Sequence, residues 1–183
     1  MLADTMRSIR RIAAVAAATA CLVWGAPPAL ADVTISDAGG PLTGLAFDQQ
    51  SSRLFAVSET GGTNIAVTDA TGGKIGDISF SADTESLQGL AVHSGSLYVG
   101  DVGDSRGKRD KITVYKLPLE VGNQSYNSYD FRYPDGAHDA KSVLVSGRGR
   151  IYVVTAGENP GIYYAELEPT RSGVNKLSRA SDA

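Results

Sequence analysis

Short apolar runs alternate with turn-forming residues along most of the chain after residue 32. Within these runs apolar and polar positions alternate with a period of two, and no stretch keeps the 3.6-residue period of a helix. Gly, Asp, Asn and Ser fill the segments between the runs, and these residues favour tight turns. The pattern predicts an all-β chain of short antiparallel strands.

A strand–turn–strand unit occurs three times in this pattern. Each unit consists of an apolar strand, a turn and a second strand of the Leu-Tyr-Val type. The first strands start at Leu45, Leu90 and Val143, which are 45 and 53 residues apart. A period of about 40–50 residues is typical of a β-propeller blade. The fold class we expect is therefore all-β, a partial β-propeller of about three four-stranded antiparallel blades in residues 32–169.

The remaining strands of each unit follow the same spacing. Third strands are expected at 64–68, 111–117 and 161–167, and fourth strands at 76–80 and 126–133. Propellers usually close with about four to eight blades, so three explanations stay open: a truncated gene product or fragment, self-association with a second copy, or an open stack with exposed apolar end faces. Residues 170–183 are either the start of a further strand or a disordered tail.

The first 31 residues have the pattern of a signal peptide. Arginines up to Arg11 form a basic head, residues 12–24 are apolar, and Ala29-Leu30-Ala31 offers small residues for cleavage before Asp32. The true start is either the first residue or Met6. An uncleaved anchor is the alternative, but the apolar run is shorter than the ~20 residues that a spanning helix needs. We expect a secreted or extracytoplasmic bacterial-type protein without membrane contact after cleavage.

Composition narrows the chemistry of the mature chain. The only cysteine of the full sequence, Cys21, lies in the apolar run that cleavage removes. Neither disulfides nor thiol catalysis are therefore expected in the mature chain. Only two histidines remain, which argues against a Cys/His zinc site. Removing residues 1–31 takes away three arginines and Asp4, and leaves 14 basic against 19 acidic residues, a net charge of −5. That charge argues against a nucleic-acid surface.

A polar loop, residues 101–110, follows the second strand of the second unit. In an up-and-down meander, residues before the first strand and after the second strand lie at the same end of a blade, where propellers commonly bind ligands. That end would carry Thr43, Glu59, Gln88, Lys141 and Glu158 around the loop. The residues that we expect to bind a ligand there are Asp101, Asp104, Arg106, Arg109 and Asp139.

The same loop allows two structural interpretations. Asp101 and Asp104, three residues apart, could bind a hard cation such as Ca²⁺, which prefers six to eight oxygen ligands. Alternatively, the aspartates cap backbone N–H groups in a turn and pair with Arg106 or Arg109. We expect no cofactor, and a bound hard cation such as Ca²⁺ is the alternative.

Other candidate chemistry in the sequence is weak. Residues 103–107 match the G-x-S-x-G hydrolase pattern, but that pattern needs a strand-to-helix turn, and here a strand follows. We therefore expect no catalytic serine and assign no catalytic residue. For His93 and His138 a plain turn position and a catalytic role stay equally open, and the meander places His93 at the end opposite to the polar loop.

The residues 98–104, Tyr-Val-Gly-Asp-Val-Gly-Asp, followed by an arginine and a β run, resemble the Asp-Ile-Gly-Asp-Asn motif of secreted bacterial β-propeller proteins, distant relatives of NHL-repeat and gluconolactonase-like propellers. Residues 132–140 and 151–155 match the same pattern. The resemblance spans most of residues 40–180. It implies the propeller fold more than an activity.

Departures from the family pattern bear on the calcium alternative. Ser105 replaces the motif's Asn, Gln88 and Lys141 stand where a Glu precedes the first strand of a blade, and Ala156 replaces a Lys. If the family's carboxylates hold a metal, two ligands are lost and a positive charge is gained. Cation affinity is then expected to be poor.

Three functional hypotheses follow. The first is an exported propeller-type binding module, without catalysis, for a small molecule, a glycan or a protein. The alternative is a Ca²⁺-dependent hydrolase of the gluconolactonase-like or phytase-like kind, in which a cation polarises the bond to be cleaved and an aspartate acts as base. The third is a truncated gene product without a function of its own.

Overall fold

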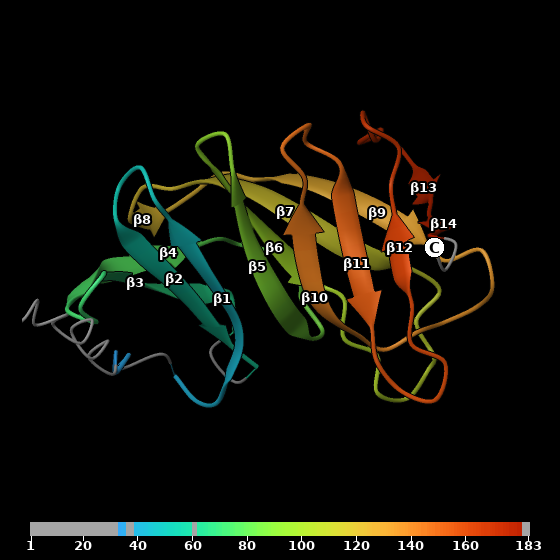
Figure 1. Ribbon diagram of the computed structural model, residues 1–183, viewed down its shortest axis with the longest axis horizontal. Coiled ribbons are helices and arrows are strands. Elements are labelled where there is room, and N and C mark those ends of the chain that lie inside the picture. Colours follow the sequence, from blue (N-terminus) through green and yellow to red (C-terminus); the bar gives the residue numbers. More distant parts are fainter. Residues whose placement is uncertain (1–32, 36–38, 60–61, 181–183) are drawn as a thin grey trace, which may run out of the picture. The chain divides into compact units, whose positions relative to one another are not determined.

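The computed structural model describes residues 33–35, 39–59 and 62–180 (Figure 1). In these residues the secondary structure consists of 14 strands in three sheets, without a helix, so the all-β prediction is confirmed. None of the described residues forms a helix long and apolar enough to cross a bilayer. The predicted signal peptide and its cleavage site before residue 32 lie outside the described residues.

Sheet 1 is an antiparallel meander, because each of its strands is followed by a short turn and pairs with the next strand. Its strands are β1 (Leu42–Asp48), β2 (Arg53–Ser58), β3 (Asn64–Asp69) and β4 (Lys74–Ser79). A two-residue strand from the next repeat, β8 (Gly122–Asn123), adds to its outer edge, parallel to β4.

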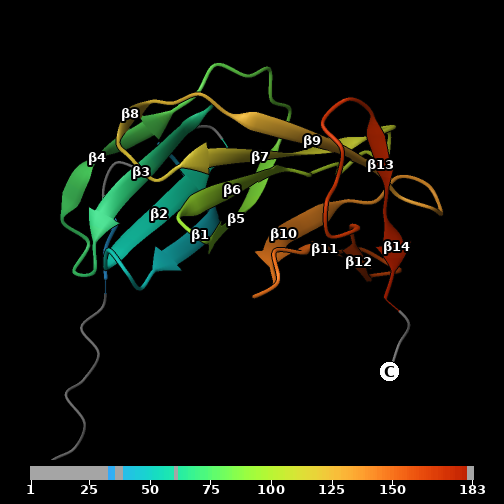
Figure 2. The same cartoon turned by 90° about the horizontal axis from the view of Figure 1, so that it is seen from above.

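Sheet 2 repeats this arrangement. Its antiparallel strands are β5 (Leu87–His93), β6 (Ser96–Asp101), β7 (Ile112–Pro118) and β9 (Asn127–Arg132). A short strand from the third repeat, β13 (Val174–Lys176), pairs in parallel with β9. In both sheets the outer edge is therefore covered by the connection between the third and fourth strands of the following repeat (Figure 2).

Sheet 3 contains β10 (Ala140–Val145), β11 (Ile151–Thr155), β12 (Ile162–Tyr164) and β14 (Ser178–Arg179). The short strand β14 pairs with β12 and supplies the fourth strand, which the sequence did not reveal for this repeat. Of the residues for which a further strand and a disordered tail were both open, 174–176 form β13 and 178–179 form β14.

The first strands β1, β5 and β10 lie next to one another and join the three sheets (Figures 1 and 2). Glycine permits this close approach. A Cβ on Gly44 would lie 2.9 Å from the backbone of Gly89, and a Cβ on Gly89 would lie 2.8 Å from the backbone nitrogen of Val143. The glycines that precede Leu45 and Leu90 in the repeat are thus explained by contact between neighbouring inner strands.

Two apolar clusters hold the sheets together. The cluster between sheets 1 and 2 includes Phe55 and Ile65 from the first and Leu97 from the second, each fully buried. The cluster between sheets 2 and 3 is centred on Phe131 and Tyr163. Because each sheet has two apolar faces, it can bury one of them only against a neighbouring sheet. Stacking of this kind places the ends of all three inner strands close together.

Candidate functional site

The polar loop between β6 and β7 is built around Asp104. Its carboxylate accepts hydrogen bonds from the backbone N–H groups of Lys108, at 3.0 Å, and Arg109, at 2.8 Å. The loop turns back at Gly107, whose φ of 60° lies in the left-handed region and whose N–H donates to the Asp104 carbonyl. Asp104 therefore fixes the loop from within, as expected for a turn-forming aspartate.

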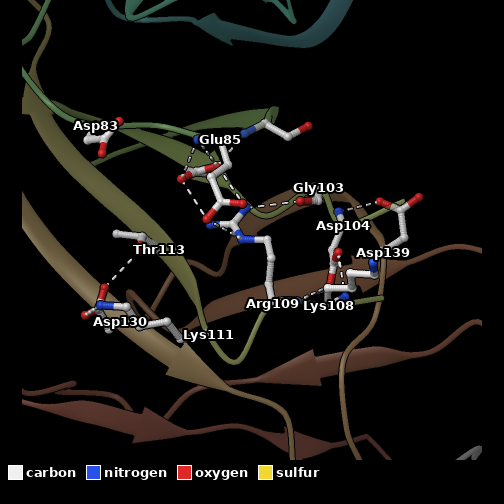
Figure 3. A network of polar contacts seen from close by, with 12 residues as sticks. Asp83, Glu85, Gly103, Asp104, Lys108, Arg109, Lys111, Thr113, Asp130 and Asp139 are labelled. Atoms are coloured by element: carbon white, nitrogen blue, oxygen red, sulfur yellow. Dashed lines mark hydrogen bonds and ion pairs between the residues drawn. The ribbon is translucent and has the colours of Figure 1, made fainter. Parts of the chain in front are cut away.

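Arg109, whose side chain lies between Glu85 and Gly103 in Figure 3, forms a buried ion pair with Asp101. The guanidinium donates from Nη1 and Nη2 to the two carboxylate oxygens, at 3.0 and 3.1 Å. The Asp101 side chain is 3% exposed and that of Arg109 is 10% exposed. Asp101 is the last residue of β6 and also accepts the N–H of Ser86 at 2.7 Å. Both charges are thus paired and hydrogen-bonded, which a buried ion pair requires.

Arg109 also holds the loop and its surroundings in place. Its Nη1 donates to the Gly103 carbonyl at 3.0 Å. Its Nε is buried and has no hydrogen-bond partner, while the Glu85 carboxylate approaches it to 3.7 Å. The Glu85 side chain is 70% exposed, so it lies over the guanidinium at the surface.

Asp139 connects this network to sheet 3. Its carboxylate accepts the N–H of Asp104 at 2.8 Å and forms an ion pair with Lys141 at 3.0 Å. Its own carbonyl accepts the N–H of Ala156, which follows β11. The loop of sheet 2 and the start of sheet 3 are therefore positioned by one side chain.

A cavity of about 290 Å³ opens above this network. Its walls come from all three sheets: Glu59 follows β2, the 103–109 loop follows β6, and Lys141 lies in β10. The full lining is Glu59, Glu85, Ser86, Gly103, Asp104, Ser105, Arg106, Arg109, Asp139 and Lys141. Loops from the same end of three sheets thus converge on one polar cavity.

The structure brings the five predicted ligand-binding residues together, but in different roles. Asp104, Arg106, Arg109 and Asp139 line the cavity, whereas Asp101 lies beneath it and supports Arg109. Arg106 is exposed, and its side chain makes no ion pair or hydrogen bond with the described residues. Among the described cations that line this cavity, Arg109 and Lys141 are in ion pairs and Arg106 is free to contact a ligand.

A second cavity of about 320 Å³ lies on the other side of Glu85 and Arg109, which line both. Its wall includes Tyr115, whose pKa is raised to about 12 by burial and by the nearby charge of Asp101. The phenol is therefore protonated at neutral pH. Another carboxylate there, Asp130, accepts a hydrogen bond from the Thr113 hydroxyl and forms an ion pair with Lys111.

The carboxylates of the loop do not fit a calcium ion. Both oxygens of Asp101 accept from Arg109, and both oxygens of Asp104 accept from backbone N–H groups. Across residues 33–35, 39–59 and 62–180, no group of three His, Cys, Asp or Glu side chains is arranged to hold a metal ion. The donors around these aspartates match a turn with an arginine pair, the second of the two structural alternatives.

The serine of the hydrolase-like pattern lines this cavity without the expected local geometry, and His93 lies apart from it. Ser105 is in an exposed turn that leads into strand β7, so the strand-to-helix geometry of a nucleophilic serine is missing there. His93 pairs with Ser96 at the β5–β6 turn, the opposite end of the strand pair from Leu87 and Asp101. It lines a different cavity, of about 370 Å³, together with Gly149 of the β10–β11 turn.

Sequence reasoning missed two features. Glu85 and Ser86, just before β5, belong to the network, although nothing in the sequence links them to a loop 16 residues later. His138 is more than a turn residue, because its Nε2 lies 3.0 Å from Asp135 and 2.9 Å from the hydroxyl of Tyr163. Tyr163 is 25 residues away on β12, so only the fold brings the three together.

No protein-family model matches the chain, and no curated protein matches its sequence. Among solved structures, Kuenenia stuttgartiensis hydrazine synthase aligns with a TM-score of 0.50 and 18% identity, over 86% of this chain and 40% of that one. A streptogramin B lyase structure aligns with a TM-score of 0.39 and 15% identity, over 80% and 56% of the two chains.

This chain spans less than two thirds of the length of either protein. At 18% identity, the likeness to hydrazine synthase shows the fold alone, a propeller-like stack of antiparallel sheets.

Proposed function

We propose that this chain is an exported β-propeller-type binding module whose three sheets are propeller blades. Its ligand, a small molecule, a glycan or part of a protein, binds in the cavity above the Arg109–Asp101 pair. The observation that supports this most directly is the convergence of loops from all three sheets on that cavity. In propeller folds such a position, beside the inner strands, combines a rigid base with variable loops.

Some side chains of the site hold the loop in place and others are exposed at the cavity surface, which supports binding rather than catalysis. Asp101 and Asp104 hold the loop by accepting hydrogen bonds, so their oxygens serve the scaffold. The charged groups at the surface of the cavity include Arg106, Lys141 and the exposed Glu59 and Glu85. Charged side chains of both signs on a pre-formed base can orient a polar ligand.

The site is tested by NMR titration of the ¹⁵N-labelled protein with a fragment library of sugars, sugar acids, amines and short peptides. A binder is expected to shift the amide signals of residues 103–109 and 139–141. Arg106→Ala should weaken that binder at least about tenfold, or about 1.4 kcal/mol. Lys74→Ala is the matched control, since Lys74 is a surface lysine of β4 outside the cavity. Binders that shift only residues elsewhere would refute the assignment.

Catalysis is tested separately, with lactones, esters and phosphate esters in the presence and absence of Ca²⁺. The proposal expects no turnover and no increase in melting temperature with Ca²⁺, because a ligand that binds only the folded state stabilises it. Hydrolysis that requires Ca²⁺ and that Asp139→Asn abolishes would favour the calcium-dependent hydrolase instead.

A further inference from the structure

The threefold repeat allows the same position to be compared in each sheet. Leu45, Leu90 and Val143 occupy one such position on the first strands, on the face turned toward the preceding sheet. Leu90 is 6% exposed and Val143 is fully buried, because sheets 1 and 2 cover them. Leu45 is 53% exposed. A residue that is buried in two repeats is therefore open to solvent in the first.

On the opposite face of each sheet, the exposed position belongs to the last sheet instead of the first. Ile65, Val114 and Ile162 lie on the third strands, on the face turned toward the following sheet. Ile65 and Val114 are fully buried, whereas Ile162 in sheet 3 is 47% exposed. Each sheet thus has a leading and a trailing apolar face, and the described structure leaves open one leading face and one trailing face.

The two open faces lie on sheets 1 and 3. The leading face is on β1 of sheet 1, with Leu42, Leu45 and Phe47 exposed by 44, 53 and 48%. The trailing face is on sheet 3, where Leu144 is 51% exposed. Cross-strand pairing places Leu144 beside Tyr152 and Tyr164, and Val154 beside Ile162. The Arg150 guanidinium lies over the Tyr164 ring, 5.0 Å from its centroid. Exposed apolar side chains gathered on one face of a sheet mark interaction surfaces.

We infer that the leading face of one chain docks on the trailing face of a second copy of the same chain. The chain itself shows that these two kinds of face fit, since a trailing face packs on a leading face between sheets 1 and 2 and again between sheets 2 and 3. The two open faces are the halves of a third such join. This inference concerns the sheet faces and does not depend on the ligand cavity.

The contact is centred on the inner strands. On sheet 1, Ala56 and Ala66 point to the same side as the leading face but are only 1 and 4% exposed, so the open part of that side is β1. In the two joins within the chain, the inner strands also make the closest approach, at Gly44 and Gly89. The same strands therefore supply the intermolecular contact.

One residue makes the intermolecular join looser than the internal ones. Ser142 occupies in sheet 3 the position of Gly44 and Gly89, immediately before the Leu45, Leu90 and Val143 position. A Cβ at Gly44 or Gly89 would come within 3.0 Å of the neighbouring backbone. The Cβ of Ser142 holds the docked strand further away, so Ser142→Gly is expected to tighten the association.

The association is head-to-tail, because the two faces belong to different sheets. Two copies can close a ring of six sheets with two equivalent joins, and six lies within the usual range of about four to eight propeller blades. Because the interface is heterologous, each copy uses its leading face in one contact and its trailing face in the other. Blocking the leading face on one copy and the trailing face on the other leaves one complete join between them.

The experiment measures mass by analytical ultracentrifugation over a range of protein concentrations. The wild-type protein should pass from monomer to dimer as concentration rises. Leu45→Asp and Leu144→Asp should each raise the dissociation constant about tenfold or more, since each places a charge in an apolar contact. An equimolar mixture of the two variants should recover dimers through the one intact join.

Leu167→Asp is the matched control. Leu167 is 45% exposed, but it borders the cavity that contains Tyr98, on the side of sheet 3 that faces sheet 2. Its substitution should leave the dissociation constant unchanged, and circular dichroism confirms that each variant folds. A protein that stays monomeric at every concentration, or dimers that survive both Leu45→Asp and Leu144→Asp, would overturn the inference.

Discussion

The guanidinium of Arg109 forms a two-point hydrogen bond with the carboxylate of Asp101, eight residues earlier, and both side chains are almost completely buried. The pair spans the base of the polar loop, so it joins the end of strand β6 to the start of the segment that leads into β7. Because Ser86 also donates to Asp101, the pair holds the approach to β5 as well.

This pair is expected to dominate the stability of the site. Asp101→Asn keeps the size of the side chain but removes its charge, which leaves the buried guanidinium with only the largely exposed Glu85 carboxylate, 3.7 Å from its Nε, as a counter-ion. Breaking a buried pair in this way costs about 3–5 kcal/mol. Urea unfolding at neutral pH should show a loss of that size.

Arg106→Ala is the control for the charge pair. Arg106 belongs to the same loop, but its exposed side chain has no ion pair among the described residues. Its removal should change the free energy of unfolding by no more than about 0.5 kcal/mol. Equal losses for Asp101→Asn and Arg106→Ala would show that the buried pair is not what stabilises the loop.

Asp104 is predicted to act on the loop locally. Asp104→Ala removes the acceptor for the Lys108 and Arg109 amides, while the Asp104 N–H can still donate to Asp139. Leaving part-buried donors without partners costs about 1–3 kcal/mol. Hydrogen exchange at the Lys108 and Arg109 amides should be faster in this variant.

Ser105→Ala, next to Asp104, provides the comparison for hydrogen exchange. The Ser105 side chain makes no hydrogen bond with the described residues, so exchange at Lys108 and Arg109 should stay as in the wild type. If the two variants exchange alike, the capping role of Asp104 is wrong.

The sequence predicted most of the strands, and the reason is physical. Period-two alternation and turn residues are local signals, so the strand pairs that start at Leu45, Leu90 and Val143 were visible without any knowledge of the fold. The strands β8, β13 and β14 are two or three residues long, and partners far along the chain define them. The two residues of β8 leave no pattern of their own, whereas β13 and β14 fall in the segment for which a further strand and a disordered tail were both open.

The site was predictable to a similar degree. The meander places Asp104 and Lys141 at the same end of their sheets, and the structure agrees. The sequence left open whether Asp101 binds a cation or pairs with an arginine, because both use the same carboxylate. In the structure Arg109 lies against Asp101, and its position depends on how the loop folds back through Gly107.

The contact between inner strands gives a prediction about Gly89. Its φ of 124° is one that side-chain-bearing residues rarely adopt, and an added Cβ would lie 2.8 Å from the backbone nitrogen of Val143. Gly89→Ala should therefore cost about 1–3 kcal/mol in backbone strain and about 1–3 kcal/mol more through the collision. Thermal unfolding measures the loss.

Gly107→Ala separates these two costs. Gly107 also has a positive φ, of 60°, but nothing lies within 4 Å of an added Cβ. Its substitution should cost only about 1–2 kcal/mol, the penalty for a left-handed alanine. A Gly89→Ala variant that is no less stable than Gly107→Ala would mean that the inner strands are not in close contact.

The cluster around His138 predicts a dependence of stability on acid pH. Burial alone would raise the pKa of Asp135, but hydrogen bonds from Tyr163 and His138 outweigh it and lower the pKa below its usual value of 3.8. Because the folded pKa is lower than the unfolded one, the stabilisation is complete above the unfolded pKa. It is lost as pH falls below about 4. The wild type should lose this contribution there, and Asp135→Asn has none to lose.

The prediction is checked by urea unfolding at pH 6, 5, 4 and 3. The stability gap between wild type and Asp135→Asn should be largest at pH 6 and narrow toward pH 3. Tyr163→Phe removes the hydroxyl that donates to Asp135 at 2.8 Å, so in that background Asp135→Asn should open a smaller gap. Other aspartates titrate alike in each pair of proteins and cancel in the difference. A gap that stays constant from pH 6 to pH 3 would mean that the hydrogen bonds of Asp135 with Tyr163 and His138 do not stabilise its ionised form.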